Sequence, residues 1–433
     1  LRDNPAAAWG VWHFEERFVS ARTVLGETIV ISDPAAIRHV LVENVGNYPK
    51  DDLQRRVLKP GLGEGLLTAE GETWRRVRRT LAPLFTPRMV DGFADIMLER
   101  AEKAASRLAA VPVGGTVNVS AEMTRVTFDV LAGTLFSDGI VSGADRFAEA
   151  VTGYFDTVGR LDPLDALGLP DWIPRLSWFT GRKSISFFEA EVKRIIARRK
   201  GEITQGTAPA DLLTALINAA DPETGIGLTD EEVAANIITF ITAGHETTAN
   251  ALGWALFLLA KHPDQRERAE REAVSAGDHP VPEWPDRLPF VRAVVEEAMR
   301  LYPPAATLTR KALTADSFGD IPIAKGALVV ISPYVVHRHR MLWSNPDLFR
   351  PERFLPGARE AIDRFQYLPF GAGPRICIGQ RFAMLEAVII LTSVLRAVRL
   401  DWPQRQVVNP VQRVTLRPVP ELQMVRMSPV RSQ

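Results

Sequence analysis

The chain has 433 residues, of which 46% are hydrophobic and 24% are charged, so it can bury a core large enough to enclose a bulky cofactor. Lys plus Arg and Asp plus Glu both total 52 and the formal net charge is zero, which excludes a global field that would hold nucleic acid or an anionic membrane. The single cysteine excludes an internal disulfide and any multi-cysteine zinc or iron–sulfur site.

The predicted elements are mostly helical with a minor β part, and no obvious linker divides residues 1–433 into separate domains. The first residues are charged and contain no apolar run, so we expect no signal or anchor and a cytoplasmic location. Asp33-Pro34 is a typical helix start, and a capping box of Thr229 and Glu232 begins a long helix. Residue patterns further predict strands at 23–32, 328–331 and 412–416, helices at 71–85, 89–108, 146–158, 184–199 and 288–301, and a proline-rich loop at 162–174.

One apolar stretch, residues 234–260, is long enough to cross a bilayer. Its middle, however, carries Glu246 with polar neighbours, and an ionised carboxylate at the centre of a bilayer is costly. We therefore predict a long helix buried inside a protein without a membrane span.

The surroundings of the lone cysteine differ from those of a structural cysteine. Residues 369–387 read PFGAGPRICIGQRFAMLEA, in which three glycines bracket Cys377 and a helix follows directly. Glycines permit tight turns and a close approach of the backbone to a flat ligand. The turn before a helix also offers free N–H donors that stabilise a thiolate. The pattern thus favours a metal-bound thiolate.

This segment resembles the cysteine-ligand loop of the cytochrome P450 superfamily, Phe-Gly-x-Gly-x-Arg-x-Cys-x-Gly. The fixed positions are filled by Phe370, Gly371, Gly373, Arg375, Cys377 and Gly379. The resemblance implies a triangular helical bundle around a buried haem b. It also implies that Cys377 is the axial iron ligand, that Phe370 packs beside the sulfur, and that Arg375 reaches a haem propionate.

Further matches extend the resemblance over nearly the whole chain. Glu297 and Arg300 share a helix face, and in the family such a pair combines with an arginine of a later Pro-Glu-Arg-Phe segment, here Arg353. Trp74 and Arg78, four residues apart on one helix, together with Arg310, are implied to lie near the propionates.

The long helix carries Ala243-Gly244-His245-Glu246-Thr247-Thr248, which is similar to the family's oxygen-binding motif. By resemblance, Gly244 leaves room on the distal side of the iron, Thr247 hydrogen-bonds dioxygen and Glu246 passes protons inward, while Ala243 borders the pocket. Substrate-pocket positions implied in the same way are small or aliphatic: Leu66, Leu67, Ile238, Ala305, Thr307, Val414 and Thr415.

Two other patterns have weaker interpretations. His337 and His339 could face one side of a strand as metal ligands, but no carboxylate or cysteine obviously completes a zinc site. The arginines at 75, 76, 78 and 79 could suggest nucleic-acid binding, yet the neighbouring Trp74 is the only aromatic residue in this segment that could stack on a base. We interpret this helix as a docking face for an electron donor.

The resemblance therefore predicts a monomeric monooxygenase that uses haem, O2 and electrons from a separate ferredoxin- or flavodoxin-type donor with its reductase. The substrate should be an apolar small molecule: residues 221–248 look similar to fatty-acid-hydroxylating members, and terpenoids, steroids and aromatics stay open. Alternatives are a peroxide-driven oxygenase, a haem isomerase, or a non-enzymatic electron carrier or gas sensor. The loop at 160–182, rich in proline and apolar residues, is the expected substrate gate.

Overall fold

The computed structural model describes residues 4, 8–23, 26–52, 58–59, 61–137, 182–403 and 406–428. Its helices are α1 (Pro34–Arg38), α3 (Gly71–Leu81), α4 (Pro87–Asp91), α5 (Ala94–Ala110), α6 (Val119–Phe136), α10 (Arg182–Gln205), α11 (Leu212–Ile217), α12 (Asp230–Lys261), α13 (Pro263–Val274), α14 (Trp284–Arg287), α15 (Pro289–Leu301), α16 (Pro333–Val336) and α17 (Gln380–Ala397). The predicted helix at 146–158, the loop at 162–174 and the expected gate, except for Arg182 at the start of α10, lie outside the described residues.

The strands are short and form small sheets. They are β1 (Phe18–Thr23), β2 (Gly26–Ile31), β3 (Thr116–Asn118), β4 (Leu308–Lys311), β5 (Asp316–Phe318), β6 (Ile321–Ile323), β7 (Leu328–Ile331), β8 (Arg399–Asp401), β9 (Asn409–Gln412), β10 (Leu416–Val419) and β11 (Gln423–Met427). A four-stranded sheet has the order β1-β2-β7-β4, with only β2 and β7 parallel, and the other sheets are β3-β11-β8, β9-β10 and β5-β6. The predicted class, mainly α with a small β part, is confirmed.

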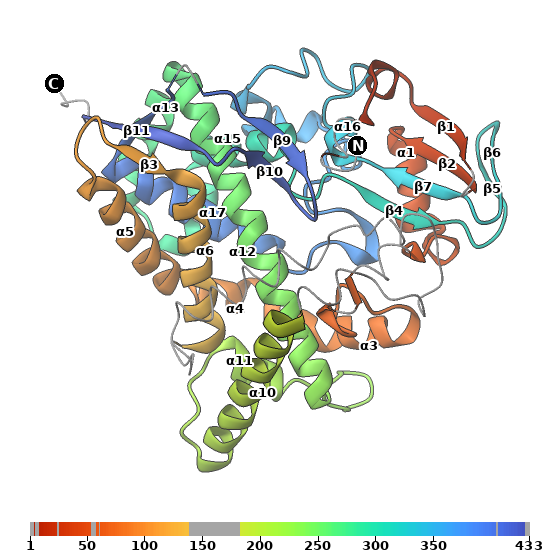
Figure 1. Ribbon diagram of the computed structural model, residues 1–433, viewed down its shortest axis with the longest axis horizontal. Helices are drawn as coiled ribbons and strands as arrows, with labels where there is room; N and C mark the ends of the chain where they lie inside the picture. The colour runs from red at the N-terminus through yellow and green to blue at the C-terminus, as the bar shows by residue number, and fades with distance from the viewer. Residues whose placement is uncertain are drawn as a thin grey trace.

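Helix α12 runs through the helical part of the molecule and packs against α6, α15 and α17 (Figure 1). Most of its residues are buried, so tertiary packing stabilises its length. Its predicted start is confirmed, because Thr229 Oγ1 accepts from the Glu232 N–H and the Glu232 carboxylate accepts from the Thr229 N–H. Among the described residues, none of the helices has the length and apolarity needed to span a bilayer.

Other local predictions are confirmed with adjusted ends. Asp33 caps α1 by accepting from two backbone N–H groups, and β7 and α15 lie where strand and helix patterns placed them. The helix predicted at 71–85 turns into a 3-10 segment at Ala82–Phe85, where Pro83 removes a helical donor. The one at 89–108 is divided between α4 and α5 at Gly92-Phe93.

Two strand predictions need correction. Residues 412–416 are not a strand: Gln412 ends β9, Leu416 begins β10, and the Arg413 N–H donates to the Thr415 carbonyl in the tight turn between them. The strand within residues 23–32 begins later than predicted: Thr23 is the last residue of β1, and it pairs with Gly26, the first residue of β2. The hairpin β9-β10 brings its turn to α12, which it contacts.

Candidate functional site

The segment that contains the cysteine is a closed turn before α17. The Cys377 N–H donates to the Phe370 carbonyl at 2.9 Å, and α17 begins three residues later. Gly371 and Gly373 adopt φ values of +71° and +72°, a region that side chains rarely enter. A Cβ at Gly373 would lie 1.9 Å from the Leu41 carbonyl oxygen. The loop therefore needs glycine here for both its turn and its close packing.

The Cys377 side chain opens to solvent on one side, while crowding by protein atoms on its other sides raises the pKa of the thiol. The Gly379 N–H and the Arg78 guanidinium act in the opposite direction and favour the thiolate. The Phe370 side chain is half-buried and packs against the main hydrophobic core. The sulfur is thus an accessible thiol with two neighbours that stabilise its anion, as a metal ligand requires.

A cluster of buried cations lies beside this loop: the charges of Lys50, Arg310 and Arg375 act on one another, with Glu70 and Asp51 as the carboxylates nearby. Burial and the charges of Arg375 and Arg310 lower the pKa of Lys50 to about 7. Burial also lowers the pKa of Arg375 to about 10 and that of Arg310 below its usual range. With its pKa near 7, Lys50 is only about half protonated at neutral pH, so an anionic ligand beside these three side chains would favour its charged form.

Trp74 belongs to the same cluster. The Arg375 guanidinium lies over the Trp74 ring, 4.1 Å from its centroid, and it donates to the Ala69 carbonyl at 2.9 Å and to the Glu70 carboxylate. Arg78, one turn after Trp74 on α3, acts electrostatically on Cys377 instead. The structure therefore brings Trp74, Arg310 and Arg375 together and places Arg78 toward the sulfur. Sequence patterns did not indicate Lys50.

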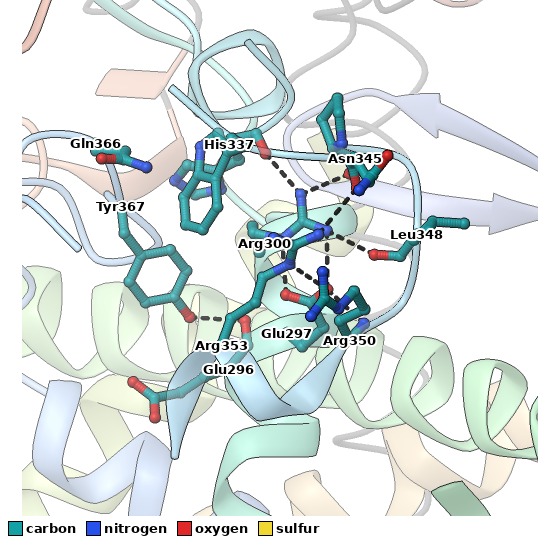
Figure 2. Close-up of polar contacts among 12 residues, drawn as sticks. Glu296, Glu297, Arg300, His337, Asn345, Leu348, Arg350, Arg353, Gln366 and Tyr367 are labelled. Carbon is teal, nitrogen blue, oxygen red and sulfur yellow. Dashed lines mark hydrogen bonds and ion pairs between the residues drawn. The ribbon is translucent and has the colours of Figure 1, made fainter. Parts of the chain in front are cut away.

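Glu297 and Arg300 form an ion pair on α15 in which both side chains are fully buried (Figure 2). Arg300 Nε donates to one Glu297 carboxylate oxygen at 2.6 Å and a terminal nitrogen donates to the other at 2.8 Å. The remaining donors of the guanidinium bind three backbone carbonyls, those of His337, Pro346 and Leu348. All five N–H groups of this arginine are therefore satisfied inside the fold.

Arg353 joins this pair from the segment after α16. Its Nε lies 3.5 Å from the Glu297 carboxylate, and a terminal nitrogen donates to the Asn345 carbonyl at 2.9 Å. The Arg350 backbone N–H also donates to Glu297, at 2.8 Å. Two guanidinium groups and a backbone amide thus share one buried carboxylate, so the long segment that crosses here is held to α15 (Figure 2).

The hydrogen-bond network around Glu297 and Arg300 extends to the cysteine loop through His337. The His337 ring Nε2 accepts from the Leu368 N–H at 2.7 Å, and the neighbouring Tyr367 hydroxyl donates to the Glu296 carbonyl at 2.8 Å. Burial and nearby arginine charges lower the pKa of His337 to about 3, so its ring is neutral and can accept. The sequence suggests for His337 only a metal-ligand role, whereas the described residues contain no group of three His, Cys, Asp or Glu that could hold a metal ion.

The motif of α12 forms a partly open turn within an otherwise buried helix. Ala243 is exposed and Gly244, Glu246 and Thr247 are partly exposed, whereas the adjacent turns are buried. The Thr247 hydroxyl donates to the Ala243 carbonyl at 2.8 Å. A Cβ at Gly244 would meet Leu131 of α6 at 3.6 Å, an ordinary contact distance, and the role of this glycine beside the iron stays a prediction. The open side of the turn is that of Ala243.

Glu246 is joined to the turn between β9 and β10. Its carboxylate accepts from Thr415 Oγ1 at 2.7 Å, and Asn250 Nδ2 donates to the same hydroxyl at 3.1 Å. Thr415, predicted as a pocket residue, is therefore a buried partner of the motif. His245 is buried, its Nδ1 lies 2.7 Å from the Ile241 carbonyl, and burial lowers its pKa, so this histidine is neutral.

Glu386 on α17 is a second carboxyl group next to the α12 motif. It is buried next to Thr248, whose single hydroxyl proton can be directed either to the Glu386 carboxyl group or to the Gly244 carbonyl 3.2 Å away. Burial raises the pKa of Glu386 to about 8, although the hydrogen bond from Thr248 acts in the opposite direction. A protonated carboxylic acid therefore lies directly behind the motif at neutral pH. Its only sequence signal is one acid within an apolar helix.

The remaining pocket candidates lie in four parts of the chain. Leu66 and Leu67 are partly buried against the main core, and Ile238 on α12 is buried. Ala305 and Thr307 are partly exposed before β4, where the Gln412 side-chain amide donates to the Thr307 hydroxyl at 3.0 Å. Val414 is exposed at the tip of its turn.

Two of the four arginines of α3 have acidic partners from distant segments, and the docking face for an electron donor stays a prediction. Arg79 pairs with Asp221 through two hydrogen bonds, of 2.9 and 3.0 Å, and Arg76 pairs with Glu232 at the start of α12. Arg75 pairs with Glu72, its one ion-pair partner among the described residues, and is largely exposed. Arg76 and Arg79 therefore hold α3 to Glu232 at the start of α12 and to Asp221 in the segment before it. Among these two arginines and Arg75, Arg75 is the one whose charge points outward.

Comparison with known proteins agrees with this geometry. The family model described as Cytochrome P450 matches residues 17–425. The "Cyclooctatin synthase" of Streptomyces melanosporofaciens is 31% identical over 393 residues, covering 90% of this chain and 83% of that protein. "Cytochrome P450 3A13" of Mus musculus is 31% identical over 395 residues, with 85% and 76% covered, and "Cytochrome P450 97B2, chloroplastic" of Glycine max is 29% identical over 428 residues, with 85% and 73% covered. The chain belongs to the cytochrome P450 family of haem monooxygenases.

Proposed function

We propose that this chain is a monomeric, cytoplasmic haem domain over residues 1–433 that inserts one atom of O2 into an apolar small molecule by hydroxylation or epoxidation. The observation that carries the proposal is the pair of carboxyl groups at the α12 motif. Glu246 is linked to Thr415, and Glu386 holds a proton beside Thr248. O2 activation consumes protons at this position, whereas an electron carrier or a gas sensor does not need them.

The residues around the cysteine loop fit haem b. The accessible Cys377 thiol would hold the iron, and the cations Lys50, Arg310 and Arg375 would pair with the propionate groups. Trp74 would flank those propionates through its contact with Arg375. When bound, the haem supplies the redox chemistry that activates O2, with the thiolate donating electron density to the iron.

The protein's own contribution is the placement of protons and the exclusion of water. Glu386, protonated at neutral pH, and the Thr248 hydroxyl lie inside the helical core. Glu246 is partly exposed and bound to Thr415, so it can exchange protons with solvent and deliver them toward Thr247. The apolar side chains nearby limit competing water.

The substrate is proposed to be apolar because the candidate pocket residues are aliphatic or small. Leu66, Leu67 and Ile238 would form one wall and Ala305 and Val414 another. Fatty acids, terpenoids, steroids and aromatics all meet this description. Electrons would come from a ferredoxin- or flavodoxin-type protein with its reductase, and Arg75 is the outward charge of α3 that such an acidic partner could contact.

Isotope labelling tests the proposal. Members of the four compound classes are first screened for a change in the ferric haem spectrum, and the strongest binder is then turned over under ¹⁸O2 with a surrogate ferredoxin and reductase. The product should carry one ¹⁸O atom. A product labelled only from added hydrogen peroxide would identify a peroxide-driven oxygenase, and an unlabelled isomer of the substrate would identify an isomerase.

A further inference from the structure

The segment between residues 63 and 68 rests directly on α12. A Cβ at Gly65 would lie 2.5 Å from Thr239 Oγ1 and 2.7 Å from the Ala235 carbonyl oxygen, and a Cβ at Gly63 would lie 3.3 Å from the Ala235 Cβ. Contacts this short leave no room for a side chain. The backbone of this segment is therefore in contact with the surface of the helix.

One side chain of α12 fastens the segment at this place. The Leu66 N–H donates to Asn236 Oδ1 at 2.8 Å, while Asn236 Nδ2 donates to the Glu232 carbonyl of its own helix at 2.8 Å. Asn236 is fully buried. Its amide is oriented by the helix and presents its oxygen to the segment, so one polar group in an apolar environment defines where Leu66 lies.

Asn236 lies on the same face of α12 as Ala243 of the motif. Asn236 and Ala243 are seven residues apart, two helical turns, so they share a face of α12 about 10 Å apart along its axis. Leu66, whose N–H bonds Asn236, and the next residue Leu67 are partly buried against the core. Their backbone position relative to the open turn at Ala243 is therefore determined by the bond from Asn236.

We propose that Asn236 is a specificity-determining positioning residue: by holding the Leu66 backbone against α12 it sets the position of the apolar wall formed by Leu66 and Leu67, and hence the size and shape of the molecules accepted. The inference rests on the proposed function, because it takes these two leucines as pocket residues. Asn236 itself touches neither substrate nor haem in this account.

The test uses the haem-loaded protein and two nitrogen ligands of ferric haem, imidazole and 4-phenylimidazole, whose binding is followed from the shift of the haem absorption band. Asn236→Leu should lower the preference for 4-phenylimidazole by about three- to tenfold, the value of one lost hydrogen bond. Imidazole is too small to reach the wall, so its affinity should stay close to that of the parent. Backbone amide exchange of Leu66 should accelerate in the same variant.

Two further variants distinguish positioning from general damage. Asn236→Asp keeps an oxygen facing the Leu66 N–H and, because burial favours the protonated acid, also a donor to the Glu232 carbonyl, so it should retain the parent preference. Gly65→Ala should push the segment away from α12, because its Cβ would meet Thr239 and the Ala235 carbonyl, and should reproduce the loss. Thr242→Val is the matched control, because the Thr242 hydroxyl bonds only its own helix, to the Ile238 and Thr239 carbonyls, and its removal should leave the preference unchanged.

An unchanged preference in both Asn236→Leu and Gly65→Ala would overturn the inference, and so would an equal loss in Thr242→Val. Failure of the proposed function is separate: it would appear as a parent protein whose reduced, CO-bound form lacks a thiolate spectrum, before any variant is compared.

Discussion

Removal of the Glu297 carboxylate should cost the fold several kilocalories per mole. Arg300 is fully buried and directs two of its five N–H groups at this carboxylate, so Glu297→Ala leaves a buried guanidinium without its counter-ion. It also removes the acceptor of the Arg350 N–H and the partner of Arg353. Breaking a buried ion pair from one side costs about 3–5 kcal/mol, a large share of a typical total stability of about 5–15 kcal/mol.

The assay is urea unfolding of the haem-loaded protein together with haem content and amide exchange of residues 366–379. The His337 carbonyl and ring link Arg300 to Leu368, so exchange should accelerate in the cysteine loop as well as near α15. Glu296→Gln is the matched control: it is the adjacent acid on α15, but its contacts are with the half-exposed Arg292 and Arg359 at 3.4 Å, worth about 1 kcal/mol or less.

Normal haem content and a loss of less than about 1 kcal/mol in Glu297→Ala would refute the reasoning, because the pair would then behave as a surface bridge. An equal loss in Glu296→Gln would show that any change to the acids of α15 damages the fold, and that Arg300 needs no specific partner.

The remaining predictions concern protons and electrons. Glu386→Gln should remove a pH dependence of stability, because the carboxyl group loses its proton near pH 4.5 in the unfolded chain and near pH 8 in the folded protein. As the pH rises through that window, the parent should lose about 1.4 kcal/mol of unfolding free energy per pH unit relative to the variant. Urea titrations of the two proteins that change in parallel with pH would contradict the buried, protonated state. Thr247→Ala should keep haem and substrate binding but release hydrogen peroxide instead of product, and unchanged product per reductant consumed would count against its role. Arg75→Glu should slow reduction by an acidic donor while sparing peroxide-supported turnover. Arg79→Glu should instead destabilise the protein, because Arg79 is bound to Asp221. A similar stability of the two variants would contradict the pairing of Arg79 with Asp221.

Features with a local cause were predictable from the sequence. A capping box needs only Thr229 and Glu232 three residues apart, and the glycine turns around Cys377 follow from their spacing. Glu297 and Arg300 pair because α15 places them on one face. In each case the partners are near neighbours along the chain.

Features formed by distant segments were not predictable in this way. The arginines of α3 look like a free basic stripe, but Arg79 meets Asp221 from 142 residues away and Arg76 meets Glu232 from 156 residues away. Lys50, His337 and Asn236 have no local signal either, since their partners are brought to them by the tertiary fold. Helix α6 has a polar face only in its first half, at Glu122, Arg125 and Asp129, and is buried on all sides from Val130 to Phe136, so its overall periodicity is weak.

The central claim, that Cys377 binds the haem iron as a thiolate, is tested most directly by the absorption spectrum of the reduced, CO-bound protein. Because Cys377 is the only thiol, the parent should show the strongly red-shifted haem band of a thiolate ligand, and Cys377→His should move this band to the position typical of imidazole-ligated haem. A thiolate-type spectrum that persists in Cys377→Ser would contradict the account.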